Sequence, residues 1–210
     1  MDELTKAERE AAVALLTVAF DADPFFRFME PDARERAALI EEVMRGNVEL
    51  ALGAKNAFGL ATEERVEGVC LWFAPGAYPP PAWRAALARG GSVARTIASW
   101  IAAPSRAKPE VITTALRIET LLDEGHPTEP YWYLQILGVD PTRQGRGIGS
   151  RMLREALAMA DRDDVASVLE TSKPANLRLY ERYGFRITRT TRLDSSPPIW
   201  TMQRARGGHP

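Results

Sequence analysis

The sequence predicts one α/β domain. Its 210 residues, 45% hydrophobic and 26% charged, have the balance of an ordinary globular protein and are enough for one sizeable core. Helix-like patterns with a period of about 3.6 residues are interleaved with short apolar runs bounded by glycine and proline. In the last third, an apolar run, a glycine-rich loop and an amphipathic pattern follow one another, which indicates the order strand, loop, helix.

The first third of the chain predicts two helices. Residues 5–20 have their apolar side chains on one face, and Thr5 with Glu8 matches a capping box at the start. The pair Asp23-Pro24 should end this helix, because the residue before a proline disfavours helical geometry. We expect the aromatic residues that follow, Phe25, Phe26 and Phe28, to lie in a loop. Residues 33–52 are expected to form the second helix.

The middle of the chain predicts a hairpin and then a helical insertion. Residues 56–62 and 67–73 have the composition of two strands joined by a short turn. Pro75, Gly76 and three consecutive prolines interrupt the pattern. Residues 82–122 lack strand alternation and favour helices, with Trp83 and Trp100 able to cap the core or to serve a dimer contact.

The C-terminal third reads as a regular series of elements. Residues 131–139 are largely apolar and predict a strand covered on both faces. Helices are expected at 147–160 and 176–183, the second stopped by Gly184 as its C-terminal cap. Further strands are expected at 166–171, 185–193 and 199–204, and residues 205–210 read as a disordered tail. Residues 1–204 are therefore expected to form a single domain.

Composition excludes several classes of partner. The formal net charge of −1 gives no general attraction to nucleic acid or to an anionic membrane. No run reaches the roughly 18 apolar residues needed to cross a bilayer, and the charged N-terminus lacks the features of a secretory signal. Cys70, the single cysteine, lies in an apolar run and is expected to be buried rather than nucleophilic. We expect a cytoplasmic protein without a metal site.

The glycine-rich loop is the segment that indicates chemistry. Residues 140–150 read DPTRQGRGIGS, directly before a predicted helix. A helix start exposes unpaired N–H groups and the positive end of the helix dipole. Gly145, Gly147 and Gly149 would let a bulky anion approach that backbone, and Arg143 and Arg146 add positive charge. The loop therefore predicts a diphosphate site.

Three phosphate motifs compete for this loop. A Walker A loop requires a lysine, which residues 140–150 lack. A dinucleotide fingerprint, GxGxxG, fails because Ser150 occupies the last glycine position. The remaining pattern, Q/R-x-x-G-x-G/A, is met by Gln144, Gly147 and Gly149. It resembles the pyrophosphate motif of the GNAT acyltransferases.

A second motif strengthens the resemblance. Residues 168–185 read VLETSKPANLRLYERYGF, and the family carries an asparagine, a tyrosine four residues later and Gly-Phe after the helix. Asn176, Tyr180 and Gly184-Phe185 fit. The likeness covers residues 129–204 and is strongest to the branch that includes puromycin N-acetyltransferase. It implies the GNAT fold: a mixed, mostly antiparallel sheet flanked by helices, with the insertion at 82–122. Its usual first strand must be very short or absent here.

The resemblance also implies a cofactor, acetyl-CoA, and a set of residues that bind it. In the family, the strand before the loop separates from its neighbour, and its free backbone groups pair with the pantetheine arm. Here that stretch is residues 136–139. The implied cofactor-binding residues are Leu137, Gly138, Val139, Gln144, Gly145, Arg146, Gly147, Ile148, Gly149, Ser150, Asn176 and Tyr180.

The resemblance gives Tyr180 the role of the acid that protonates the sulfur of coenzyme A. Tyr183 is the rival and is expected to be structural. For the base, Glu170 near a strand end is either a satisfied structural acid or a functional one, because an unpaired carboxylate buried there would be costly. His126, Glu129 and a water relay are the alternatives.

The implied activity is transfer of an acetyl group to a primary amine of a small molecule. Phe25, Phe26, Trp72 and Trp132 are the candidate lining of the acceptor pocket, with Phe73 and Tyr133. The alternative is a non-catalytic acyl-CoA-binding protein of the same fold that regulates a partner. The habit of the family suggests a homodimer.

Overall fold

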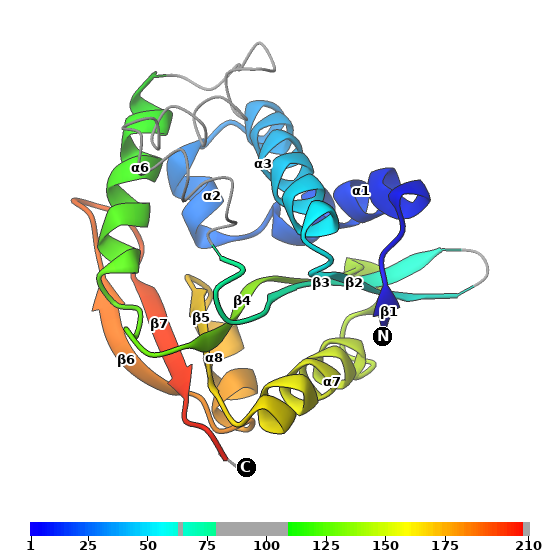
Figure 1. Ribbon diagram of the computed structural model, residues 1–210. Helices are drawn as coiled ribbons and strands as arrows, with labels where there is room; N and C mark the ends of the chain where they lie inside the picture. Colours follow the sequence, from blue (N-terminus) through cyan, green and yellow to red (C-terminus); the bar gives the residue numbers. More distant parts are fainter. Residues whose placement is uncertain (63–64, 79–108, 208–210) are drawn as a thin grey trace.

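The protein, seen in a computed structural model, consists of one sheet with helices on both faces (Figure 1). The structure describes residues 1–62, 65–78 and 109–207. Among these residues the sheet has seven strands in the order β1-β2-β3-β4-β5-β7-β6. Only the β4–β5 pairing is parallel, and every other pair is antiparallel. The prediction of a mixed, mostly antiparallel sheet is confirmed.

The N-terminal elements follow the sequence patterns closely. The expected first strand is present but has only two residues, and it pairs with β2. Glu8 accepts hydrogen bonds from the Thr5 amide at 2.9 Å and from the Thr5 hydroxyl at 2.6 Å, so the expected capping contact forms. The elements are β1 (Asp2–Glu3), the 3₁₀ turn η1 (Lys6–Glu8), α1 (Arg9–Phe20), α2 (Pro24–Met29) and α3 (Ala33–Gly53).

The segment of three phenylalanines forms a short helix, α2, and the prediction of a loop there is wrong. Asp23 caps this helix, since its side chain accepts a hydrogen bond from the Phe25 amide at 2.9 Å. Pro24 occupies the first helical position, where its missing N–H costs nothing and its fixed φ favours the helix. The Asp-Pro pair that ends α1 therefore also begins α2.

The remaining elements largely confirm the sequence predictions. Of the predicted insertion, only α6 lies among the described residues; residues 82–108, with Trp83 and Trp100, lie outside them, as do residues 208–210 of the tail. None of the described helices is long and apolar enough to cross a membrane. The elements are β2 (Ala57–Ala61), β3 (Val66–Phe73), α6 (Pro109–Asp123), β4 (Tyr131–Val139), η2 (Pro141–Arg143), α7 (Ile148–Asp163), β5 (Ala166–Thr171), α8 (Pro174–Glu181), β6 (Arg186–Thr191) and β7 (Ile199–Arg204).

The centre of the sheet is interrupted at Gln135. In the β3–β4 ladder, Leu71 pairs with Ile136 and Trp72 with Leu134, so Gln135 is an extra residue in β4. At the same point the parallel ladder between β4 and β5 ends, its last pair being Leu134 and Leu169. β4 continues for five residues beyond this pair without β5 beside it. The predicted separation of β4 from its neighbour agrees with this register.

Two apolar layers cover the sheet. On one face, α1 and α3 pack on β3 through buried residues such as Leu16, Ile40 and Phe73. On the other, α7 and α8 pack on β3, β4 and β5 through Met152, Leu153 and Phe185, among others. Gly138 permits the close approach of α1, because a Cβ there would lie 2.3 Å from Leu16 Cδ2. This packing places α1 beside the part of β4 that β5 no longer accompanies.

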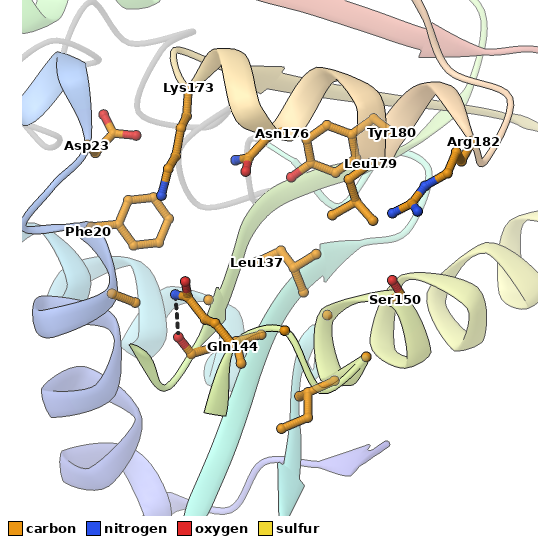
Figure 2. Close-up of a pocket in the computed structure, with 17 residues that line it drawn as sticks. Phe20, Asp23, Leu137, Gln144, Ser150, Lys173, Asn176, Leu179, Tyr180 and Arg182 are labelled. Carbon is orange, nitrogen blue, oxygen red and sulfur yellow. Dashed lines mark hydrogen bonds between the residues drawn. The ribbon is translucent and has the colours of Figure 1, made fainter. Parts of the chain in front are cut away.

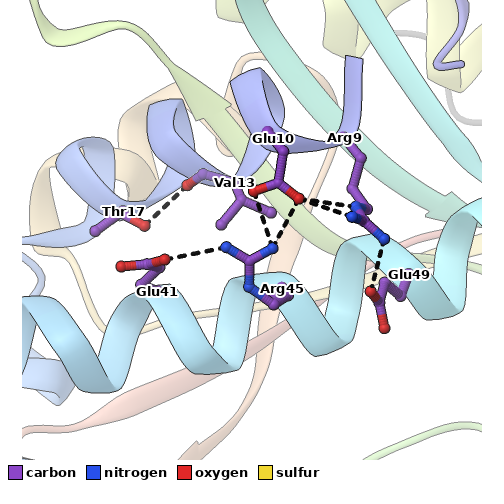
Figure 3. A network of polar contacts seen from close by, with 7 residues as sticks. All are labelled: Arg9, Glu10, Val13, Thr17, Glu41, Arg45 and Glu49. Atoms are coloured by element: carbon purple, nitrogen blue, oxygen red, sulfur yellow. Dashed lines mark hydrogen bonds and ion pairs between the residues drawn. The ribbon is translucent and has the colours of Figure 1, made fainter. Parts of the chain in front are cut away.

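The outer surfaces of α1 and α3 are joined by ion pairs (Figure 3). Arg45 of α3 donates to both carboxylate oxygens of Glu10, at 2.8 and 2.9 Å, and to Glu41 at 3.0 Å. Arg9 of α1 reaches Glu49 at 3.0 Å. The three glutamates are exposed and the two arginines partly exposed, so each pair contributes about 0–1 kcal/mol, and the apolar contacts beneath them hold the two helices together.

Arg36 ties the connection between α1 and α2 to α3. Its guanidinium is buried and donates through Nη1 to the carbonyl oxygens of Glu30, at 3.2 Å, and Pro31, at 2.9 Å. Its Nε donates to the Asp21 carbonyl at 3.2 Å and lies 3.3 Å from the Asp21 carboxylate. One side chain therefore satisfies carbonyl groups at both ends of α2.

We predict that Arg36→Met destabilises the fold by about 2–3 kcal/mol, because it leaves buried carbonyl groups without a donor. Chemical denaturation should show this as a lower midpoint with an unchanged slope. Arg34→Met, on an exposed position of the same helix, is the matched control and should change stability by less than about 0.5 kcal/mol. Equal stability of the two variants would contradict the role assigned to Arg36.

Candidate functional site

The glycine loop connects β4 to α7 with two residues in the left-handed region. Gly145 has φ of +77° and Gly147 has φ of +82°, conformations that side chains rarely adopt. A Cβ at either position would meet no atom within 4 Å, so the backbone faces open space. Asp140 shapes the beginning of the loop, accepting from the Thr142 amide and hydroxyl, each at 2.8 Å.

The loop delivers the N-terminus of α7 to this open space. The first amides of a helix have no carbonyl partner within it. The first hydrogen bond of α7 runs from the Arg151 amide to the Gly147 carbonyl, at 2.9 Å. The amides of residues 148–150 come before this bond in the chain and have no helical partner. Gln144 bends back and donates from Nε2 to the Val139 carbonyl at 3.2 Å (Figure 2). Residues 148–150, whose amides have no carbonyl partner within α7, line the cavity in front of the loop.

This cavity, the loop cavity, has a volume of about 440 Å³. It is bounded by the loop and α7 on one side and by α8 on the other (Figure 2). All the residues that the family resemblance implies for the cofactor line it except Arg146, which is exposed: Leu137, Gly138, Val139, Gln144, Gly145, Gly147, Ile148, Gly149, Ser150, Asn176 and Tyr180.

In the described part of the chain, the positive side chains that line the loop cavity are Lys173 and Arg182, which the sequence motifs did not indicate. They occupy the two ends of α8, Lys173 before its first residue and Arg182 after its last. Figure 2 shows both side chains directed into the space between α8 and the loop. Arg143, by contrast, lies 3.7 Å from the Glu67 carboxylate. The sequence signal for Lys173 and Arg182 is that each is a basic residue directly beside the helix that carries Asn176 and Tyr180.

Tyr180 stands where α8 faces β4. Its side chain is buried and packs on Phe185 with ring centroids 5.9 Å apart. Burial, with a smaller effect from Cys70, raises the pKa of Tyr180 well above its ordinary value, so the phenol keeps its proton. Asn176, one turn earlier, lies with Nδ2 3.4 Å from Thr171 Oγ1. Tyr183 instead donates to the Ser150 carbonyl at 3.1 Å, a contact between the turn after α8 and the start of α7.

A second cavity, the aromatic cavity, adjoins the first and has a volume of about 250 Å³. It lies between α2, α3, α6 and the sheet, and Phe25 and Phe26 of α2 line it. The two cavities share Phe20, Asp23, Leu137, Asn176 and Tyr180, so they meet at Tyr180.

The two tryptophans expected in the acceptor pocket lie elsewhere. Trp72 and Trp132 stack on each other in the core, with ring centroids 5.4 Å apart and planes at 13°. Trp132 donates from Nε1 to Asp163 at 2.9 Å. Neither residue lines the loop cavity or the aromatic cavity, and neither do Phe73 and Tyr133. The bulge at Gln135 explains part of this, because Trp132 and Leu134, on one side of it, face the core formed with α7.

Glu170 is part of a polar chain in which His126 contacts Glu170 and Tyr131 contacts His126. Its Oε1 lies 2.6 Å from His126 Nε2, and the Tyr131 hydroxyl lies 2.9 Å from His126 Nδ1. Glu170 also lines the aromatic cavity, so the carboxylate is both held by a partner and open to a ligand. Glu129, an alternative base, is exposed and lines neither cavity.

The pKa of His126 is raised by these surroundings. Desolvation alone would lower it, but the hydrogen bond and charge of Glu170, with the charge of Asp123, outweigh that effect. Because the folded pKa exceeds the unfolded one, protonated His126 stabilises the fold fully below about pH 6.5. The contribution is lost as the pH rises through the raised folded pKa.

Asp23 is the carboxylate that borders both cavities. Its Oδ1 accepts from the Phe25 amide at 2.9 Å and from the Ser172 hydroxyl at 2.8 Å. Burial raises the pKa of Asp23, against the lowering effect of these hydrogen bonds and of the Lys173 charge. In the part of the chain that the structure describes, no group of three or more His, Cys, Asp or Glu residues is placed to hold a metal ion.

Comparisons with known proteins agree with this geometry. Residues 110–187, from α6 to β6, match the family model described as acetyltransferase (GNAT) domain. Over 84 residues the chain is 39% identical to N-alpha-acetyltransferase RimI of Mycobacterium tuberculosis, covering 38% of this chain and 53% of that protein. Over 76 residues it is 34% identical to acetyltransferase Atu2258 of Agrobacterium fabrum, covering 36% and 52%. The chain thus spans about half the length of these curated relatives.

Solved structures share the fold over nearly the whole chain. A Corynebacterium glutamicum protein described as histone acetyltransferase HPA2 and related acetyltransferase superposes with a TM-score of 0.62 at 23% identity, covering 97% of this chain and 94% of that one. Arylalkylamine N-acetyltransferase 2 of Aedes aegypti gives 0.64 at 13%, with 97% of both chains covered. The chain has the GNAT fold, and the sequence matches support the GNAT acetyltransferase family.

The Glu170–His126 contact predicts an elevated pKa for His126 in solution. A proton NMR titration should give a His126 pKa above 6.5. Glu170→Gln should lower this pKa, because the neutral glutamine no longer offsets the desolvation of the imidazolium. Glu129→Gln, an exposed change near His126 in sequence, is the control and should leave the titration unchanged. A wild-type pKa at or below 6.5 would show that Glu170 does not hold the imidazolium.

Proposed function

We propose that the protein is an N-acetyltransferase that moves an acetyl group from acetyl-CoA to a primary amine of a small molecule in a ternary complex. One observation carries the proposal: a cavity lined by helix-start amides and cations meets, at Tyr180, a cavity lined by aromatics and carboxylates. Such a pair of cavities suits an anionic donor and a cationic acceptor with their reacting groups at the junction.

The loop cavity fits the diphosphate of coenzyme A. The amides at the start of α7 and the dipole of that helix favour negative charge, and Lys173 and Arg182 add two cations. Open space where Gly145 and Gly147 would carry a Cβ lets phosphate oxygens reach the backbone. The stretch of β4 after Leu134, which β5 no longer accompanies, offers backbone groups to an amide-bearing arm. When bound, acetyl-CoA supplies the thioester carbonyl that the amine attacks.

The residues at the junction would then handle the protons. The ammonium must lose a proton before attack, and the leaving thiolate gains from a proton donor. Tyr180, protonated and buried where the cavities meet, is proposed as that donor. Asp23 and Glu170 are proposed to bind the ammonium and accept its proton, Asp23 at the junction and Glu170 beside it. Holding both reactants in one site lowers the entropic part of the barrier.

A small amine acceptor is favoured by the modest volume of the aromatic cavity, about 250 Å³. Structures described as agmatine N-acetyltransferase and Drosophila melanogaster polyamine N-acetyltransferase share the fold, with TM-scores of 0.61 and 0.55. Their substrates support the acceptor class by analogy only. The matched N-alpha-acetyltransferase makes a peptide amine the second candidate. The alternative is a non-catalytic acyl-CoA-binding protein that regulates a partner. The Tyr180→Phe variant distinguishes this alternative from an enzyme.

Four narrower points belong to the same proposal. The branch that includes puromycin N-acetyltransferase is favoured by Glu129-Pro130, by Leu169-Glu170-Thr171 and by the late Trp200 and Met202. Residues 1–204 are proposed as one catalytic domain. A cytoplasmic location fits the single free cysteine, Cys70, which is buried and has its pKa raised to about 12 by desolvation. A homodimer is proposed from the habit of the family alone.

Thermal denaturation with acetyl-CoA, CoA, ATP and NAD should show stabilisation by the first two ligands only. A ligand specific to the native state adds about 2.7 kcal/mol at 100 times its dissociation constant. Gly147→Trp should abolish the shift by filling the loop cavity. Gly76→Trp, at a φ of +77° outside both cavities, controls for backbone strain and should keep it. A shift with ATP or NAD alone would contradict the assignment of the cofactor.

Tyr180→Phe should lower kcat by roughly 100-fold, the usual contribution of a general acid, and leave the affinity for acetyl-CoA nearly unchanged. Tyr183→Phe is the matched control: it removes the hydrogen bond to the Ser150 carbonyl from the turn that follows α8 and should retain most of kcat. CoA-thiol release and calorimetry give the two numbers. An unchanged kcat in Tyr180→Phe would remove the acid role, and binding without turnover of any amine would favour the non-catalytic alternative.

A further inference from the structure

The two cavities have opposite electrostatic character. Among the residues that the structure describes, the charged side chains that line the aromatic cavity are acidic: Asp23, Glu119 and Glu170. The loop cavity shares Asp23 but adds Lys173 and Arg182. Glu119 lies on α6, and α6 lines the aromatic cavity but not the loop cavity. Glu119 is therefore not among the residues at which the two cavities meet, whereas Asp23 and Tyr180 are.

Buried hydrogen-bond acceptors line the same cavity. Gln135 Oε1 and Glu170 Oε2 are buried, the Tyr133 hydroxyl interacts with the Glu170 carboxylate, and the Tyr78 hydroxyl interacts with the Gln135 side chain. The remaining atoms of these groups are engaged: Gln135 Nε2 donates to Asn47 at 3.1 Å, and Glu170 Oε1 contacts His126 at 2.6 Å. The Glu170 side chain is 10% exposed. These acceptor oxygens add negative potential to the cavity, which therefore suits a cationic ligand that brings N–H groups.

Glu119 is held in a partly desolvated setting. Desolvation, reinforced by the charge of Asp123 one turn later on α6, raises the pKa of Glu119 to about 7. Its side chain remains accessible, and it lines the cavity beside apolar residues of the same helix, Ala115, Ile118 and Leu122. A positive group placed there would relieve the repulsion between the two α6 carboxylates while its alkyl portion contacts the apolar wall.

We propose that Glu119 forms a second cation subsite, and that the acceptor is an elongated amine with a second cationic group, such as a diamine. The inference rests on the proposed function, since it places the reacting amine at the junction beside Asp23. The chain between the two charges would cross Phe25, Phe26 and the acceptor oxygens of Gln135 and Glu170. An amine with one charge would leave Glu119 unpaired, and an amino acid would set its carboxylate against Glu119.

The test compares α,ω-diaminoalkanes of three to six carbons with n-alkylamines and ω-amino acids of the same lengths. Wild type should give at least about ten-fold higher kcat/KM with the best diamine than with its matched alkylamine. Glu119→Gln should reduce the diamine value about ten-fold and leave the alkylamine value unchanged. Glu110→Gln, an exposed change on α6 outside both cavities, is the matched control and should alter neither.

Equal kcat/KM for diamine and alkylamine, or an equal effect of Glu119→Gln on both, would overturn the subsite and leave the proposed acetyltransferase function standing. If acetyl-CoA binds but none of these amines is acetylated, calorimetry of the same amines in the presence of CoA decides. Tighter binding of the diamine, lost in Glu119→Gln, would support the subsite and count against the proposed reaction. Equal binding of both amines would overturn the subsite.

Discussion

The end of the β4–β5 ladder at Leu134 and Leu169 is the constraint on which the rest of the structure depends. Parallel strands normally pair along their whole shared length, because unpaired backbone groups in a core are costly. The extra residue Gln135 and the divergence of the two strands leave a length of β4 free in the middle of the sheet. Both cavities open beside that length, with Leu137 in each of them. The gap in the sheet therefore borders both cavities.

Short sequence devices around this gap each place more than one functional group. Asp23-Pro24 ends α1, caps α2 and puts a carboxylate where the two cavities meet. Gly145 and Gly147 turn the chain so that the first amides of α7 face outward. The helix α8 carries a cation at each end and Tyr180 on the side facing β4. Local backbone geometry and the chemistry of the site are thus specified by the same residues.

The separation of charge across the site gives its two halves different preferences without a large net charge on the chain. Helix dipole, amides and cations act in the loop cavity, and carboxylates act in the aromatic cavity. Asp23 and Tyr180 lie at the boundary, where both kinds of ligand would be within reach. The net charge of −1 does not reveal this arrangement, because it adds all charges of the chain together. The local potential in each cavity depends on the charges that line that cavity.

The sequence by itself determined most elements, the glycine loop and the motif around Tyr180, because period, capping residues and glycine positions act over a few neighbouring residues. It misjudged α2, where the capping strength of Asp23 outweighs the aromatic run that suggested a loop. Only the tertiary structure decided which side chains share a cavity: Lys173 and Arg182 enter it, while Trp72 and Trp132 stack in the core. The physical reason is that one bulge in β4 and the packing of α6 and α8 set the side-chain directions, and both depend on contacts between residues far apart in the chain.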